Sequence, residues 1–197
     1  MSEEFQIVAG HVVLDFANTL DYRFDPARTI EMLPSFERLV DFVLQSQLIE
    51  EPSGRRLKAG TDRRNAERVL RRAIEFRETL DQLLRSVIAH KAPRGSCLES
   101  FNGFVAQHRK QERFSWKSGE LVRGYAEIVN TADWLLWLLV DSAASLLTSI
   151  DLVNVRECHD QSCRWLFLDQ SKNHSRRWCS MDLCGNRSKV RRFREQT

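Results

Sequence analysis

Four of the five cysteines lie beyond residue 157, in two pairs with the same internal spacing. The pairs are Cys158-x4-Cys163 and Cys179-x4-Cys184, and fifteen residues separate them. Two ligands that are close in sequence can chelate a metal from one tight turn, and four thiolates can surround one Zn²⁺ at tetrahedral corners, with Zn–S distances of about 2.3 Å. The spacing therefore predicts that two such turns come together and that all four cysteines bind one structural zinc ion.

Alternative roles for the cysteines account for less of this pattern. Unconnected buried thiols are common in protein cores, but they explain neither the matched spacing nor the lack of cysteine in the first 96 residues. A catalytic zinc usually keeps an open coordination position, which four cysteines would close. His159 and His174 are near enough in sequence to replace a ligand, although surface histidines in polar turns explain both. Cys97 is expected to be an ordinary half-buried thiol at a helix start.

The residues around the cysteine pairs predict a small treble-clef-like module. Trp165 and Phe167 alternate with leucines as in a strand, and residues 170–175 are polar and turn-like. This pattern predicts a β-hairpin between the two cysteine pairs. After Cys184 the strand pattern ends, and a helix is expected. So small a module buries too little apolar surface to be stable alone, so the metal would supply much of its folding free energy.

The same segment carries most of the positive charge. From Cys158 onward there are nine basic and four acidic residues, whereas the preceding residues hold two more acids than bases. This asymmetry marks the segment that would meet a polyanion, and arginine suits paired contacts to phosphate or guanine. Val190 and Phe193 are expected to dock the terminal helix on the module. The alternative is a solvated tail whose charge only aids solubility. The candidate nucleic-acid contacts are Arg176, Arg177, Arg187, Lys189, Arg191, Arg192 and Arg194.

The rest of the chain is expected to be helical. Apolar residues at helical spacing predict helices over residues 11–23, 35–48, 62–90, from 96 onward and over 126–149. Ser35, Thr61 and a capping box of Ser96 with Glu99 are the expected N-caps, and EPSG (51–54) is expected to end the second helix. Residues 113–125 alternate in polarity and predict a short hairpin, and residues 150–158 look extended.

These patterns predict a mainly α fold in two domains. An irregular helical domain with a short β-hairpin would span residues 1–151, and the zinc module would span residues 152–197. In the first domain, Asp15, Asn18, Thr19, Asp21 and Arg23 form a polar set within an apolar helix, and Asp15, Asn18 and Arg23 are the candidate ligand residues. They could line a small-ligand pocket, with Asn18 and Arg23 touching the effector. The favoured alternative is that Asp15 or Asn18 ties down a neighbouring loop while Asp21 and Arg23 serve the helix end, because buried polar groups need partners in any case.

Two motifs resemble a known family. CGNR at residues 184–187, within RRWCSMDLCGNRSKVRRFR, is similar to the CGNR zinc finger, and LDFANTLDYR at residues 14–23 resembles the opening motif of the ABATE domain. Ala17 stands where valine is expected, which is a conservative difference. The resemblance implies a bacterial protein with a mostly helical N-terminal domain, a four-cysteine zinc finger and a role in stress-related transcription regulation.

The sequence argues against several other classes of protein. It has no glycine-rich phosphate loop, no His-Glu-x-x-His motif and no serine nucleophile elbow, so no enzyme is expected. The start MSEEFQIVAG is not a secretion signal, and the apolar run 134–140 is too short to span a bilayer. A cytoplasmic protein without a membrane partner is therefore expected, in a reducing compartment where paired cysteines bind metal.

Two functions remain open at this point. The first is a transcription regulator that binds nucleic acid, with DNA favoured over RNA, through the zinc module, while the helical domain senses a small-molecule effector or a protein partner. Stacking of RNA bases on Trp165, Phe167 or Trp178 is conceivable, but alternating strand positions suggest core residues. The second is a protein–protein interaction or small-ligand-binding protein whose zinc is purely structural. Ion pairs of Arg187, Arg191 and Arg194 with acids of the helical domain would favour the second.

Overall fold

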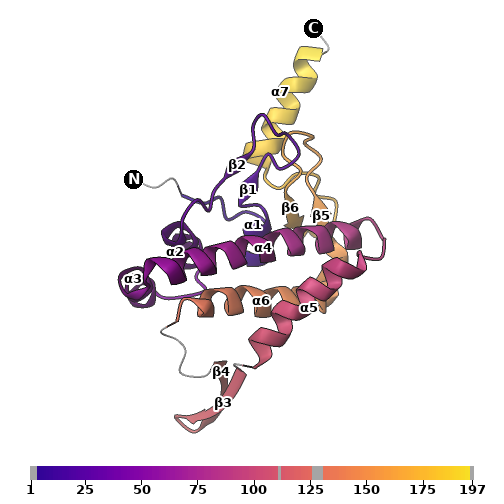
Figure 1. Cartoon of the computed structure of the whole chain (residues 1–197). Coiled ribbons are helices and arrows are strands. Elements are labelled where there is room, and N and C mark those ends of the chain that lie inside the picture. Colours follow the sequence, from indigo (N-terminus) through magenta and orange to yellow (C-terminus); the bar gives the residue numbers. More distant parts are fainter. Residues whose placement is uncertain (1–3, 111, 126–130, 196–197) are drawn as a thin grey trace. The chain divides into compact units, whose positions relative to one another are not determined.

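The computed structural model describes residues 4–110, 112–125 and 131–195 (Figure 1). The chain folds into two compact units. We call Met1–Pro34 together with Leu146–Thr197 the terminal unit, and Ser35–Ser145 the helical unit. This division differs from the linear one at residue 151, which stays a prediction about independent domains.

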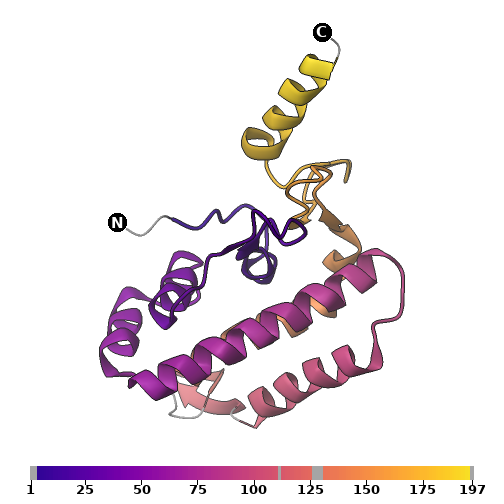
Figure 2. The same cartoon turned by 45° about the horizontal axis from the view of Figure 1, so that its top comes forward.

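The helical unit is built mainly of helices, as the sequence predicts. The longest is α4 (Arg63–Ile88), against which α2 (Phe36–Gln45) and α5 (Gly95–Arg109) pack. Figure 2 shows α5 returning beside α4 after their connecting loop. The remaining elements of this part of the chain are α3 (Glu51–Gly60), α6 (Asp133–Leu147), β3 (Glu112–Lys117) and β4 (Glu120–Tyr125).

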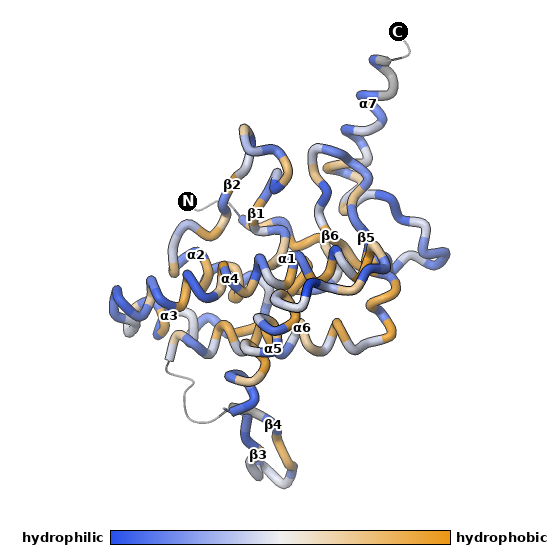
Figure 3. Tube along the Cα trace, turned by 45° about the vertical axis from the view of Figure 1, so that its right-hand side comes forward, coloured by the Kyte–Doolittle hydropathy of each residue, from blue (hydrophilic) through white to orange (hydrophobic). Residues whose placement is uncertain are grey.

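Helical periodicity explains the core of this unit. Val69, Ala73, Phe76, Leu80 and Leu84 recur along one face of α4 and are all buried. The segment that forms α6 is the most apolar of the helices in this unit, as its colour in Figure 3 shows. The predicted hairpin is confirmed, since β3 and β4 pair in antiparallel register. No described helix combines the length and the apolar character that crossing a lipid bilayer requires.

Several predicted helix ends are wrong, and local hydrogen bonds explain why. Ser35 does cap α2, because its hydroxyl accepts from Arg38 N at 3.3 Å. At the start of α4 the N-cap is Asp62 rather than Thr61, because the Asp62 carboxylate accepts from Asn65 N at 3.0 Å. The capping box of Ser96 and Glu99 does not form: α5 begins at Gly95, with no side-chain hydrogen bond at its cap.

The EPSG sequence also has a different role from the one expected. It opens α3 instead of ending the preceding helix, because proline lacks a backbone N–H and fits the first turn of a helix. Gly54 in this helix lies against Leu44 of α2, and a Cβ atom at this position would stand 2.6 Å from Leu44 Cδ1. Glycine therefore allows α2 and α3 to approach closely.

The terminal unit begins with a helix shorter than predicted. Of the helix expected over residues 11–23, only α1 (Val12–Ala17) forms. The chain then continues as β1 (Leu20–Asp21), which pairs with β2 (Ile30–Glu31). Thr19 Oγ1 donates to Phe16 O at 2.7 Å and competes with continued helix. Residues expected to be extended after α6 instead form the 3₁₀ helix η2 (Ile150–Asn154) before β5 (Val155–Glu157).

The hairpin predicted between the two cysteine pairs is also wrong. The strand β6 (Leu166–Leu168) pairs with β5, which precedes the first cysteine pair. Downstream of β6, the chain folds around Asp169, whose carboxylate accepts from Ser171 N, Ser171 Oγ and Arg176 N. These bonds hold the following residues in a loop. The module ends with the π-helical turn η3 (Met181–Gly185) and α7 (Asn186–Glu195), the expected terminal helix.

Candidate metal centre

The four predicted cysteines come together in the terminal unit. Their Sγ atoms all lie within 4.8 Å of one another, and the Cys163–Cys179 and Cys179–Cys184 distances are both 3.6 Å. All four side chains are buried, and none forms a disulfide. A tetrahedral zinc with Zn–S bonds of about 2.3 Å requires sulfurs about 3.8 Å apart. The cluster therefore fits one structural Zn²⁺, bound by Cys158, Cys163, Cys179 and Cys184.

Each pair of ligands belongs to its own turn. Cys158 follows β5, where its N–H donates to Trp165 O at 2.8 Å, and Cys163 N donates to Asp160 O at 2.9 Å. Arg164 takes a left-handed φ of 55°, which turns the chain toward β6. Cys184 lies in η3, where its N–H donates to Ser180 O at 3.0 Å. Two closed turns thus present two sulfurs each.

The crowded thiols require a cation to ionise together. Hydrogen bonds from Cys163, Cys179 and Cys184 lower the pKa of Cys158, whereas donation to Cys158 raises the pKa of Cys163. Thiols that share protons in this way cannot all be thiolates at neutral pH. A divalent ion replaces the shared protons, so zinc binding releases protons and acid opposes it.

Arg187 supports the metal site from outside the four sulfurs. Its Nη2 donates to Cys184 Sγ at 3.1 Å, and its Nε lies 3.0 Å from Asp160 Oδ2. Burial alone would lower the pKa of Arg187, but the bonds to Cys184 and Tyr22 and the charge of Asp160 raise it. Zn²⁺ with four thiolates carries a net charge of about −2. The arginine of the CGNR motif therefore offsets negative charge at the cage.

Asp160 is the member of this site that sequence reasoning missed. Its carboxylate is fully buried, and Oδ1 accepts from Ser162 N at 3.1 Å and from Ser162 Oγ at 2.9 Å. Oδ2 has no well-aligned hydrogen bond, so its contact with Arg187 is mainly an ion pair. Arg191 Nη1 lies 3.6 Å from Oδ1. An acid inside a Cys-x4-Cys turn, in an otherwise basic segment, is the signal that could have revealed it.

The polar residues near the N-terminus have structural partners. Asp15 Oδ1 accepts from Val8 N and Ala9 N, both at 2.9 Å, and burial raises the pKa of Asp15 to about 6. The Asn18 amide bonds both backbone groups of Leu166, donating to its O at 2.8 Å and accepting from its N at 2.9 Å.

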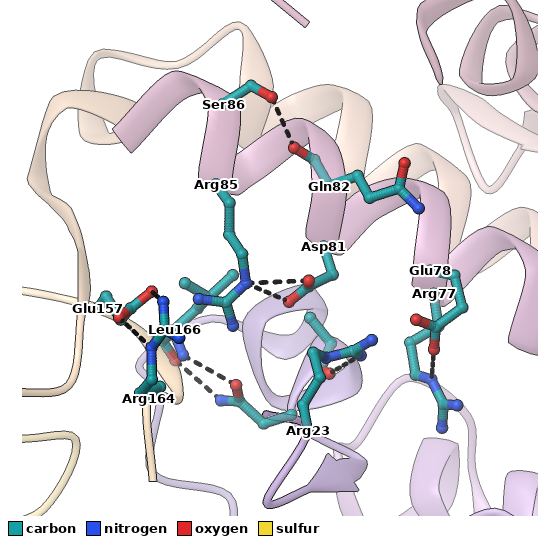
Figure 4. Close-up of polar contacts among 12 residues, drawn as sticks. Arg23, Arg77, Glu78, Asp81, Gln82, Arg85, Ser86, Glu157, Arg164 and Leu166 are labelled. Atoms are coloured by element: carbon teal, nitrogen blue, oxygen red, sulfur yellow. Dashed lines mark hydrogen bonds and ion pairs between the residues drawn. The ribbon is translucent and has the colours of Figure 1, made fainter. Parts of the chain in front are cut away.

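Arg23, the third predicted ligand residue, serves the end of α1. Its Nη2 donates to Ala17 O at 3.1 Å, as Figure 4 shows beside the bonds that end at Leu166. The described contacts of Asp15, Asn18 and Arg23 therefore favour the structural alternative. That these residues bind a ligand stays a prediction.

The first residues of the chain, up to Asp21, are bonded to the zinc module in two further places. Trp165 Nε1 donates to Asp21 Oδ1 at 2.8 Å, and Leu168 N donates to Ala9 O at 2.7 Å. Because Asn18 also bridges to Leu166, the first turns of the chain and the zinc module share one folded unit.

The seven candidate nucleic-acid contacts fall into different environments. Arg176 donates to Trp178 O at 2.8 Å, to Val8 O at 3.2 Å and to Cys179 O, so it holds the module together. Arg187 and Arg191 face Asp160. Arg177, Lys189 and Arg194 are exposed and form no ion pair within the described part of the chain. The side chain of Arg192 lies outside the described residues.

The structure also places the remaining residues singled out from the sequence. His159 is contacted by Arg177 and His174 by Asp169 O, and neither belongs to the cysteine cluster. Trp165 and Phe167 are buried, as expected of core residues. Val190 is 51% exposed, so it does not dock α7 as predicted. The side chain of Phe193 is outside the described residues.

A cavity of about 340 Å³ lies beside the cysteines. Its walls include Cys163, Cys179, Cys184, Tyr22 and Trp165. This opening gives a small chelator a route toward the sulfurs, although the cysteine side chains themselves are buried.

Two family models match the chain. The ABATE model, described as "Putative stress-induced transcription regulator", matches residues 10–150. The CGNR zinc finger model matches residues 154–197 and includes the four clustered cysteines. A comparison with curated proteins found no match.

Proposed function

Because the chain belongs to the ABATE family and ends in a CGNR zinc finger, we propose that it is a transcription regulator that binds DNA through the zinc module. In this role the helical unit senses a small molecule or a protein partner. DNA as a ligand implies that the protein acts in the bacterial cytoplasm.

One observation carries the proposal: α7 is anchored at its start and exposed beyond it. The zinc ligand Cys184 and the Arg187–Asp160 ion pair hold the N-terminal end of α7. Lys189, Val190 and Arg194 are all exposed beyond this anchor. An exposed basic helix on a rigid scaffold suits the DNA major groove, which admits an α-helix.

The cations divide into two groups with different roles. Arg176 and Arg187 stabilise the module, because their guanidinium groups bond to the backbone or to the metal site. Lys189, Arg194 and Arg177 carry the contact with phosphate. Arg191 lies between the two groups, since its side chain is 47% exposed but 3.6 Å from buried Asp160.

The test is duplex DNA binding by the zinc-loaded protein over a range of salt concentrations. Each phosphate contact contributes about −0.9 to the log–log salt slope, so Lys189→Gln with Arg194→Gln should flatten the slope by about 2 and weaken binding. Arg55→Gln with Arg63→Gln is the matched control, because both side chains are exposed in the helical unit and pair with Glu51 and Glu67. Absence of binding at low salt, with zinc bound, would refute the proposal.

A protein partner is the second candidate function. The β3–β4 hairpin exposes Phe114, Trp116 and Leu121, which are 64%, 72% and 66% exposed. Trp116 and Leu121 are cross-strand partners, and alternation places Phe114 on the same face. An exposed apolar face of this kind often marks a protein interaction site. If the DNA test fails, this face is the first region to probe.

A further inference from the structure

A cavity of about 390 Å³ opens in the helical unit, remote in sequence from the cysteines. Its volume lies within the usual range for small-molecule sites, about 300–1,000 Å³. Helices α4, α5 and α6, with the residue that follows α5, supply its walls. The lining residues are Arg68, Arg72, Gln107, Lys110, Asp133 and Trp137.

The cavity wall carries more positive than negative charge. Three cations line it, whereas Asp133 is the one acid among the lining residues. Arg68 binds both carboxylate oxygens of Asp133, with Nη1 2.8 Å from Oδ1, and Arg72 Nη1 lies 3.4 Å from the same Oδ1. One carboxylate therefore faces two guanidinium groups. Lys110 makes no ion pair within the described part of the chain.

The arginine side chains are held in place rather than free in solvent. The Arg68 side chain is 38% exposed and that of Arg72 is 23% exposed. Arg72 also donates to Gln107 Oε1 on α5, and its guanidinium lies 5.8 Å from the centre of the Phe104 ring. Burial weakens the hydration of these guanidinium groups, and their positive charge exceeds the negative charge of the one carboxylate beside them. Binding of an anion in the cavity is therefore favourable. Arginine pairs well with carboxylate and phosphate oxygens.

We propose that this cavity binds a small organic anion, through a carboxylate or phosphate group on the ligand. Arg72 and Lys110 contact the anionic group, Asp133 and Gln107 hold the arginines in position, and the ring of Trp137 forms an apolar wall. This inference rests on the sensor role of the helical unit in the proposed function, and it names the class of effector.

The test is ligand binding to the full-length zinc-loaded protein without DNA. Inorganic phosphate and benzoate are the two probes, with sodium chloride at equal ionic strength as the reference. Thermal unfolding and isothermal titration calorimetry are the readouts. We expect at least one probe to raise Tm in a saturable way. Stabilisation by phosphate alone would indicate a phosphorylated effector, and stabilisation by benzoate alone would indicate an aromatic or apolar carboxylate.

Three variants locate the binding site. Arg72→Gln and Lys110→Gln should each weaken the active probe about tenfold or more, whereas Arg63→Gln should leave its affinity unchanged. Arg63 is a matched control because it lies on the same helix, is exposed, pairs with Glu67 and is outside the cavity. Lys110→Gln provides a second test if Arg72→Gln fails to fold, since Lys110 is exposed.

Two results would overturn the inference. One is that neither probe stabilises the protein beyond chloride, and the other is that Arg63→Gln loses binding as fully as Lys110→Gln. Because no DNA is present, failure here leaves the DNA-binding proposal intact, and failure of DNA binding leaves this one intact.

Discussion

Asp160 and Arg187 show how single charges shape the zinc site. A buried carboxylate without a cation nearby would be strongly destabilising, and a tetrathiolate zinc cage is itself negative. Arg187 meets both needs, because it contacts Cys184 Sγ and Asp160 Oδ2 at once. The arginine of the CGNR motif is therefore a structural residue in this protein, whatever else it contacts.

Arg187→Gln is expected to weaken zinc retention. The variant loses the bond to Cys184 and leaves buried Asp160 without its Arg187 partner. Zinc transfer to a chromogenic chelator should therefore be about tenfold faster, which is the lower end of the effect of removing a residue that supports a metal ligand. Arg194→Gln is the control, because Arg194 is exposed on the same helix without a described ion pair. Equal release rates for both variants would contradict this role of Arg187.

Asp15 is expected to make stability depend on pH. Its folded-state pKa of about 6 lies above its ordinary value of 3.8, because burial disfavours the charged form. The folded protein thus binds the proton more tightly, so the stabilisation is present below about pH 4 and is lost as pH rises through 6. Asp15→Asn keeps an oxygen that can accept from Val8 and Ala9 but does not titrate.

The measurement is urea unfolding at pH 5 and pH 7.5. From pH 5 to 7.5, the wild type should lose about 1 kcal/mol more stability than Asp15→Asn. The comparison with the variant cancels the effect of acid on the zinc site. Parallel pH profiles of the two proteins would show that Asp15 titrates normally in the folded state.

At the scale of elements, pairing and packing override local preference. Alternation from Trp165 to Leu168 predicts a strand, and β6 (Leu166–Leu168) forms there, but its partner β5 lies before the first cysteine and could not be chosen from the pattern alone. Likewise, EPSG has the composition of a helix end, yet α3 starts there with proline in its first turn, and Gly54, which has no Cβ, lets this helix approach Leu44.

The two glycines of α3 are expected to respond in opposite ways to alanine. Gly54→Ala places a Cβ against Leu44 and should destabilise the protein by about 1 kcal/mol, because the gain in helix propensity offsets part of the overpacking. Gly60→Ala meets nothing within 4 Å and should be neutral or slightly stabilising. Chemical denaturation of both variants tests the difference, and a Gly54→Ala variant as stable as Gly60→Ala would show that Leu44 moves aside freely.

For the whole molecule, the main result is that the two ends of the chain belong to one unit. Leu168 N of β6 donates to Ala9 O, Asn18 after α1 bonds to Leu166 of β6, and Trp165 bonds back to Asp21. Within the N-terminal segment, Asp15 of α1 accepts from the amides of residues 8 and 9. We therefore expect the metal to stabilise the start of the chain as well as its end.

Removing zinc is expected to loosen both chain ends together. In hydrogen exchange of the full-length protein, chelation should remove protection from the amides of Val8, Ala9 and Leu168, because their partners lie in the zinc-dependent unit. Amides of α4 around Leu80 and Leu84 should stay protected, because they belong to the helical unit. Unchanged protection at Val8 and Ala9 would show that the N-terminal segment folds without the metal.

The sequence by itself determined the zinc ligands, the helical class and the basic terminal helix. Metal-ligand spacing, helical periodicity and charge are local properties, so they can be recognised in the sequence without knowledge of the fold. The tertiary structure alone decided that β6 pairs upstream, that Asn18 bonds to the distant backbone of Leu166, and that Arg176 and Arg187 are anchors while Lys189 and Arg194 face solvent. These roles depend on partners up to 168 residues away, because a polar side chain bonds to whatever the fold brings near it.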